Sequence, residues 1–182
     1  MSELVDIEKT VFKVTDTVDP SVMTVERGNG VSFIIGKKEN GKFMPYPVNE
    51  DEDKKELLAA AVKNLINSNP CIPKSLSEFD EYKSDDILST CYTVSSTSVY
   101  YGAEQLNELS EQLNDELYIL QFDSDTTLIC PVSQFEPEEM EAAFNGLENC
   151  LTDEIMVFDR TSKLQNMSEW QENHRLQHNQ GR

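Results

Sequence analysis

Few side chains in this sequence form the patterns that enzymatic catalysis requires. The sequence holds two histidines, His174 and His178, which lie four residues apart in a polar C-terminal stretch. On a helix this spacing would place both imidazoles on one face, where they could hold a metal ion, but no third ligand lies nearby in the sequence. A Ser/His/Asp triad needs a histidine base. We interpret the two histidines as tail residues without a catalytic role and predict that the chain is not an enzyme.

Carboxylates are the other candidates for chemistry. Asp123 and Asp125 could bind a divalent cation together, but the residues after them lack the spacing of a calcium loop, which favours the polar tip of a hairpin. The glutamates within 136–141 match the first turn and the solvated face of a helix. Because paired carboxylates for glycoside hydrolysis need only be close in space, a carboxylate- or metal-dependent hydrolase remains an alternative. We predict neither a metal site nor a cofactor.

The cysteines are predicted to be reduced, buried or half-buried thiols. None belongs to a C-x-x-C pair, which a zinc site would need. The acidic start of the chain lacks the features of a signal peptide, so we expect a cytoplasmic protein, in which thiols stay reduced. The four are Cys71, Cys91, Cys130 and Cys150.

The distribution of charge is the most unusual feature of the sequence. The 182 residues include 34 acids and 15 Lys or Arg, for a net charge of −19. Between Lys83 and Arg160 there are 17 acids and no Lys, Arg or His. Such a stretch cannot neutralise itself through local ion pairs, so its electrostatic field is negative. Solubility alone would favour this surface, whereas a surface that meets a basic groove would also explain why every base is excluded.

This charge argues against several classes of partner. Nucleic acid is an improbable partner for most of the surface because phosphate binding needs stripes of Lys and Arg. An anionic membrane surface is equally improbable, and no stretch approaches the 18 or so consecutive apolar residues that a membrane span needs. A modest DNA contact stays open through the one basic concentration, which is N-terminal. It consists of Lys9, Lys13, Arg27, Lys37, Lys38 and Lys42.

The first part of the chain is predicted to form an antiparallel meander with a packed helix. Turn signals at 27–30 and 37–41 separate apolar stretches that alternate with polar residues. Asn49 is expected to cap a helix that begins at Glu50, and the apolar face of this helix includes Ile66. Strands are expected at 22–26, 31–35 and 42–48, and residues 10–18 are expected to form a strand or an extended arm.

The second part is predicted to continue as helix, hairpin, helix and strand. A connecting loop with at most one short turn of helix is expected over 70–86. One helix is expected from Ala103 to Leu113, and another opens at Ser133 or Glu136 and buries Met140, Ala143, Phe144 and Leu147. Strands are expected at 87–94, 117–122, 126–132 and 154–159.

These elements predict one compact α+β domain over 1–164, followed by a polar tail over 165–182. Two sub-units, 1–69 and 84–164, are possible within the domain, joined by the acidic loop. Trp170 is the one large apolar residue of the tail, which could form a frayed helix. Tyr100 and Tyr101 could anchor an interface, but packing in the core is the favoured interpretation.

The segment 100–160 resembles an uncharacterised α+β family, a domain of unknown function common in gut Firmicutes. The resemblance is carried by Tyr101-Gly102-Ala103, Leu117-Tyr118-Ile119-Leu120, Leu128-Ile129-Cys130-Pro131-Val132 and Ile155-Met156-Val157-Phe158-Asp159-Arg160. The first half of the chain matches loosely. This sequence has Gln121-Phe122-Asp123 where the family has Pro-Ser-Ser. The resemblance implies no catalytic residues.

In size, acidity and family affiliation the chain is also similar to type II-A anti-CRISPR proteins of gut bacteria, which share no motif. This resemblance implies a partner, the type II CRISPR nuclease with its guide RNA. The physical fit is that such a nuclease holds nucleic acid in a positively charged channel and reads its PAM with arginines. An acidic surface can mimic nucleic acid at such sites.

We therefore predict a non-enzymatic inhibitor, of phage or mobile-element origin, that binds a basic nucleic-acid-handling protein. The alternative is a bacterial or mobile-element protein with an unrelated regulatory role. The prediction requires the acids to form one coherent anionic face, on which Glu104, Glu108 and Glu111 share one side of a helix. The candidate partner-binding residues are Asp85, Asp86, Glu104, Glu108, Glu111, Asp115, Glu116, Asp123, Asp125, Glu136, Glu138, Glu139 and Glu141.

Overall fold

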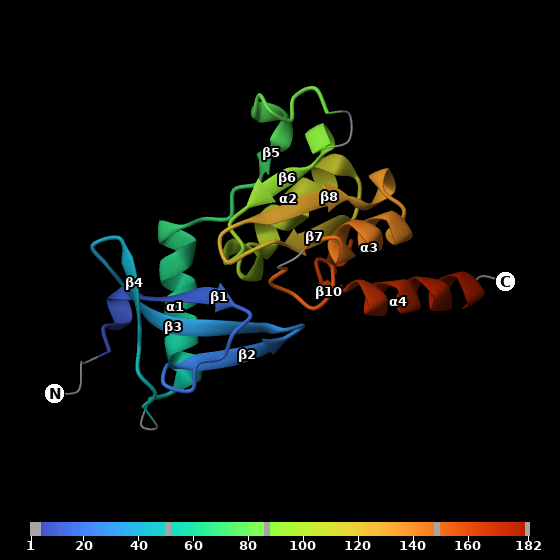
Figure 1. Ribbon diagram of the computed structural model, residues 1–182. Coiled ribbons are helices and arrows are strands. Elements are labelled where there is room, and N and C mark those ends of the chain that lie inside the picture. The colour runs from blue at the N-terminus through green and yellow to red at the C-terminus, as the bar shows by residue number, and fades with distance from the viewer. Residues whose placement is uncertain (1–4, 50–51, 86–87, 148–149, 181–182) are drawn as a thin grey trace.

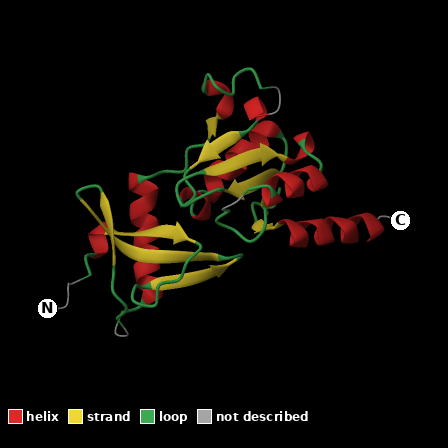
Figure 2. Ribbon diagram, in the orientation of Figure 1, coloured by secondary structure: helices red, strands yellow, loops and turns green. Residues whose placement is uncertain are grey.

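The computed structural model describes residues 5–49, 52–85, 88–147 and 150–180 and, for 175–180, the helical backbone alone. The chain is a single compact α+β unit, as predicted, and it is built on two antiparallel sheets (Figures 1 and 2). Five short 3-10 helices connect the main elements within these residues. They are η1 (Ile7–Lys9), η2 (Leu76–Glu78), η3 (Leu88–Thr90), η4 (Ser98–Tyr100) and η5 (Val132–Gln134).

The first sheet is centred on its third strand. β3 pairs with β1 on one side and with β2 and β4 on the other. Both tight connections of β3 are Asn-Gly pairs with positive φ, at Asn29-Gly30 and Asn40-Gly41, which suits hairpins. The strands are β1 (Thr10–Thr15), β2 (Thr24–Gly28), β3 (Val31–Glu39) and β4 (Lys42–Pro45).

The strand order differs in two respects from the predicted meander, because β1 pairs with β3 and not with β2, and β4 lies on the same side of β3 as β2. The connection between β1 and β2, residues 16–23, contains Pro20 and no Asn-Gly turn, so it does not form a tight hairpin. The β2–β3 hairpin leaves the other side of β3 open, and β1 occupies it.

The predicted helix of the first part is α1 (Lys54–Ser68), and it packs on the first sheet. Its N-cap is Asp53, whose side chain accepts hydrogen bonds from the backbone N–H groups of Lys55 and Glu56, so the predicted cap at Asn49 is wrong. The predicted start at Glu50 lies outside the described residues. Ala61 and Leu65 are buried, whereas Ile66 is exposed, because it lies beyond the edge of the apolar face.

The second sheet has six strands in the order β10-β9-β7-β8-β6-β5. The fully buried β7 lies near its centre and pairs with β8 and β9. The strands are β5 (Lys74–Ser75), β6 (Tyr92–Val94), β7 (Leu117–Gln121), β8 (Thr127–Pro131), β9 (Met156–Phe158) and β10 (Leu164–Asn166). The predicted strand over 87–94 is therefore shorter, because η3 occupies its first half.

Helices cover both faces of this second sheet. Along β7, Leu117 and Ile119 pack with α2 (Ala103–Leu113), whose bounds match the prediction. Tyr118 and Leu120 point to the opposite face, since neighbouring side chains alternate along a strand. That face packs on α3 (Pro137–Asn145) and α4 (Met167–Gln180). Of the predicted buried face of α3, Met140 is buried and Phe144 half-buried. Ala143 lies to one side of these two residues on the helix and Leu147 lies beyond the end of α3, and both are exposed.

The segment predicted as a polar tail contributes to the second sheet. β10 pairs with β9, and Met167 and Trp170 are buried in the same core as Tyr118. Figure 1 shows α4 leaving the sheet directly after β10. The apolar side chains that make this packing possible are few and are spread among polar residues, so the sequence pattern conceals them.

An aromatic joint connects the two sheets. Phe33 stacks on Phe12 with ring centroids 4.3 Å apart, and the ring of Tyr100 meets Phe33 edge-on at 4.9 Å. Tyr101 meets Phe12, so both tyrosines pack in the core, as favoured. The Asn29 side chain adds a polar clamp, since its Nδ2 donates to the carbonyl of Glu154 at 3.0 Å and its Oδ1 accepts from the Glu154 N–H at 2.9 Å.

Among the helices within the described residues, none has both the length and the apolar character that crossing a lipid bilayer requires.

Candidate functional site

Three of the predicted acids form a row along α2. Glu104, Glu108 and Glu111 are all exposed, as their spacing on one helix face requires. The carboxylate of Glu111 accepts a hydrogen bond from Asn107 Nδ2 at 2.9 Å. Among the described residues no Lys, Arg or His forms an ion pair with these three glutamates. This α2 row therefore presents three solvated negative charges along one helix.

A second group lies where β7 begins and α3 begins, at one end of the second sheet. We call it the acidic end and define it as Asp115, Glu116, Glu136 and Glu138. Asp115 Oδ2 accepts the backbone N–H of Ser133 at 2.9 Å, which ties the loop before β7 to η5. These four residues come from two segments that the β7–β8 pairing brings together.

Glu116 is the carboxylate of the acidic end with the most partners. Its Oε2 accepts a hydrogen bond from Trp170 Nε1 at 3.1 Å and lies 3.5 Å from His174 Nε2. Its Oε1 accepts the backbone N–H of Arg160 at 3.3 Å. Glu116 therefore fastens α4 and the β9–β10 turn to the sheet, and His174 has a role that its interpretation as a tail residue missed. The i, i+4 spacing of Trp170 and His174 was the available sequence signal.

The acidic end surrounds a buried phenol. Tyr118 is 0 % exposed and its hydroxyl has no hydrogen-bond partner among the described residues. Burial, and after it the negative charges of Glu136, Glu138, Asp115 and Glu116, together raise the pKa of Tyr118 to about 12. The negative charges of these four carboxylates thus all act on the Tyr118 hydroxyl, so the acidic end behaves as one negatively charged group.

The predicted acids of the β7–β8 hairpin lie elsewhere. Asp123 Oδ1 accepts the backbone N–H groups of Asp125 and Thr126, both at 2.7 Å, as expected of a hairpin tip. Asp123 lines a cleft of about 380 Å³ with Lys13, and Asp125 lines one of about 330 Å³ with Lys13 and Lys38. The hairpin acids therefore share clefts with lysines of the first sheet.

The remaining predicted acids lie outside both the α2 row and the acidic end, although Glu139 and Glu141 are next to the acidic end on α3. Asp85 is exposed, and its Oδ1 accepts the N–H of Leu88 at 2.8 Å, at the far edge of the sheet. Asp86 lies outside the described residues. Glu139 and Glu141 are exposed on α3, where Glu139 Oε2 accepts the N–H of Glu136 at 3.1 Å.

The acids as a whole do not form the single face that the sequence analysis required. α2 and α3 pack on opposite faces of the second sheet, and the hairpin acids lie at the other end of β7 from Asp115. The α2 row and the acidic end are neighbours in the chain, however, because Asn114 ends α2 in the left-handed conformation and leads directly into Asp115. We take the α2 row and the acidic end together as the candidate site.

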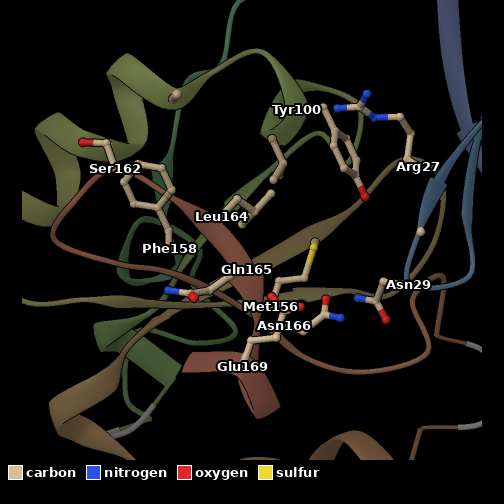
Figure 3. A pocket seen from close by; sticks show the side chains of 13 residues that line it. Arg27, Asn29, Tyr100, Met156, Phe158, Ser162, Leu164, Gln165, Asn166 and Glu169 are labelled. Carbon is tan, nitrogen blue, oxygen red and sulfur yellow. The ribbon is translucent and has the colours of Figure 1, made fainter. Parts of the chain in front are cut away.

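A separate cleft of about 470 Å³ opens between the two sheets (Figure 3). Arg27 and Asn29 line it from the first sheet, Gln165 and Asn166 from β10 of the second sheet, and Glu169 from α4. The Arg27 guanidinium lies 5.3 Å from the centre of the Phe33 ring, over the aromatic joint. Sequence reasoning missed this cleft because its residues come from distant segments without a shared motif.

The described residues offer no constellation for metal-dependent chemistry. Within them, no group of three or more His, Cys, Asp or Glu side chains is placed to hold a metal ion. The cleft in Figure 3 has one lining acid, Glu169. The separate cleft of about 380 Å³ is lined by Asp16 and Asp123 together with Lys13, but the Asp123 carboxylate already accepts a hydrogen bond within its own turn.

Comparison with protein-family models, with curated proteins and with solved structures found no match. The functional argument therefore rests on the surface itself.

Proposed function

We propose that this chain is a non-enzymatic acidic protein that binds a basic, nucleic-acid-handling protein through the α2 row and the acidic end. The observation that carries the proposal is the set of exposed carboxylates of Glu104, Glu108 and Glu111, which no base of the described chain neutralises. Binding a cationic surface would relieve the repulsion among them, and their field would steer that surface toward α2.

A groove built for nucleic acid is the natural partner of such a row. Its Lys and Arg side chains are arranged to meet successive negative charges, and charge-assisted bonds to carboxylates resemble those to phosphates. The specific target that we propose is the type II CRISPR nuclease with its guide RNA, whose nucleic-acid channel is positively charged. A regulatory protein whose acidic surface serves solubility alone is the alternative that the experiment must separate.

The test measures both binding and inhibition. The immobilised nuclease–guide complex should retain the chain at low salt, and retention should fall steeply as salt is added. DNA cleavage by the nuclease should slow when the chain is present. In the triple variant Glu104→Lys, Glu108→Lys, Glu111→Lys, affinity should fall by at least about tenfold. Unchanged cleavage with the wild-type chain would reject this nuclease as the target.

A second triple variant controls for net charge. Glu8, Glu26 and Glu56 are exposed residues of the first part of the chain, remote in sequence from α2. Reversing all three to Lys changes the net charge by the same amount as reversing the α2 row. This control should bind like the wild type. Equal losses in both triple variants would show that overall charge, and not the α2 row, determines binding.

A further inference from the structure

Two buried cysteines face each other across the second sheet. β6 and β8 are antiparallel with Tyr92 opposite Ile129, which places Cys91 opposite Cys130. Cys91 is 0 % exposed and Cys130 is 1 % exposed. Their Sγ atoms lie 3.0 Å apart, within the distance of a thiol–thiol hydrogen bond.

The backbone of Cys91 makes this pair geometrically suited to a disulfide. Its carbonyl accepts the N–H of Leu76, and its own N–H donates to the carbonyl of Leu88, so both groups point away from β8. Cys91 and Cys130 are therefore a non-hydrogen-bonded pair, for which the Cα atoms of antiparallel strands are about 4.5 Å apart. Disulfides span Cα separations of about 4.4–6.8 Å.

The two thiols also differ in acidity. The hydrogen-bonding contact between the two thiols lowers the pKa of Cys91, and the same contact together with burial raises the pKa of Cys130. Of the two thiols, Cys91 therefore gives up its proton more readily, and the thiolate is the form that reacts with oxidants. Burial raises the pKa of both Cys71 and Cys150, which makes these two thiols less reactive.

We propose that Cys91 and Cys130 are a reversible oxidation site, at which hydrogen peroxide converts the two thiols into a disulfide between β6 and β8. The Cys91 thiolate attacks one peroxide oxygen, the O–O bond breaks, and a sulfenic acid and hydroxide form. The hydroxide takes the proton of the Cys130 thiol, giving one water. The resulting thiolate attacks the Cys91 sulfur and expels the second hydroxide, which becomes water on gaining the proton that Cys91 had lost. Both sulfurs are oxidised and both peroxide oxygens are reduced.

The bond would act on a weakly held edge of the sheet. β6 pairs with β8 through three residues, and β5 pairs with β6 through two. A Cys91–Cys130 disulfide would fasten β6 covalently to the centre of the sheet and hold β5 through it. This inference is independent of the proposed function, because neither cysteine belongs to the α2 row or the acidic end.

The experiment treats the reduced full-length chain with hydrogen peroxide, alkylates the remaining thiols and maps them by mass spectrometry. We expect alkylation of Cys71 and Cys150, a peptide linked through Cys91 and Cys130, and reversal by a dithiol reductant. The unfolding midpoint of the oxidised chain should rise by at least about 4 °C. The wild-type chain suffices for this test, so it does not depend on whether a variant folds. Alkylation of all four thiols, or a link between any other two, would overturn the proposal.

Serine variants add a matched comparison. Cys91→Ser and Cys130→Ser should each abolish the intramolecular link and the rise in the midpoint. Cys71→Ser, which removes a cysteine outside the pair, should keep both. A midpoint that still rises on oxidation of Cys91→Ser would assign the stabilisation to another residue and would also overturn the proposal.

Discussion

Trp170→Ala tests whether the segment after β10 belongs to the core of the protein. Trp170 is 8 % exposed, its ring meets Tyr118 edge-on with centroids 6.3 Å apart, and its indole N–H donates to Glu116. A tryptophan buries roughly 150–250 Å², which at about 25 cal/mol per Å² corresponds to roughly 4–6 kcal/mol as an upper bound. Measured Trp→Ala substitutions in cores cost about 3–5 kcal/mol, and we expect the free energy of unfolding to fall by this amount.

Urea denaturation followed by circular dichroism measures this loss. Trp170→Phe keeps most of the apolar contact and removes the donor to Glu116, which retains the N–H of Arg160, so it should cost about 1–2 kcal/mol. Glu172→Ala alters an exposed position of the same helix and should stay within about 0.5 kcal/mol of the wild type. A Trp170→Ala variant as stable as Glu172→Ala would refute the packing of α4 on the second sheet.

Two further substitutions probe the acidic end and the joint between the sheets. Tyr118→Phe removes a buried hydroxyl that has no partner among the described residues and should raise the free energy of unfolding by about 1 kcal/mol in urea titrations. The pKa of Tyr118 is raised to about 12, whereas that of an unfolded tyrosine is about 10. This difference leaves the free energy of unfolding unchanged below pH 10 or so and lowers it as the pH rises through about 12. Tyr118→Phe removes this titration and should therefore make the loss of stability at alkaline pH less steep. Gly30→Ala should cost roughly 1–3 kcal/mol by thermal denaturation, because φ is +72° and a Cβ would lie 2.6 Å from Asp153 Oδ1. Gly41→Ala is the matched control, because φ is +79° there and nothing lies near a Cβ, so it should lower the free energy of unfolding by less. Equal losses of stability in the two variants would show that the contact with Asp153 does not contribute.

The elements with strong local signals could be predicted from the sequence. The bounds of α2 matched because its leucines recur at helical spacing and Asn114 can adopt the left-handed conformation that ends a helix. The β2–β3 and β3–β4 hairpins matched because Asn-Gly pairs dictate tight turns. For Tyr100 and Tyr101, packing against the core was the favoured of two interpretations, and both are half-buried there.

The features set by distant pairings could not be predicted. That β1 pairs with β3 depends on which edge the β2–β3 hairpin leaves open, and no residue of β1 encodes this choice. The packing of Trp170 depends on the opposite face of β7, which is remote in sequence. The division of the acids between the faces of the second sheet depends on where α2 and α3 pack, so charge counted along the chain says little about how it is grouped in space.

The position of β10 and Trp170 has a consequence for the order in which the protein can be made. The second sheet starts with β5 at Lys74, but its core also needs Met167 and Trp170, which are translated almost a hundred residues later. On the ribosome, β7, β8 and α3 therefore emerge before Met167 and Trp170, so the face bearing Tyr118 lacks this part of its cover until the end of the chain is made. A nascent chain in this state exposes apolar surface that attracts chaperones or other unfinished chains.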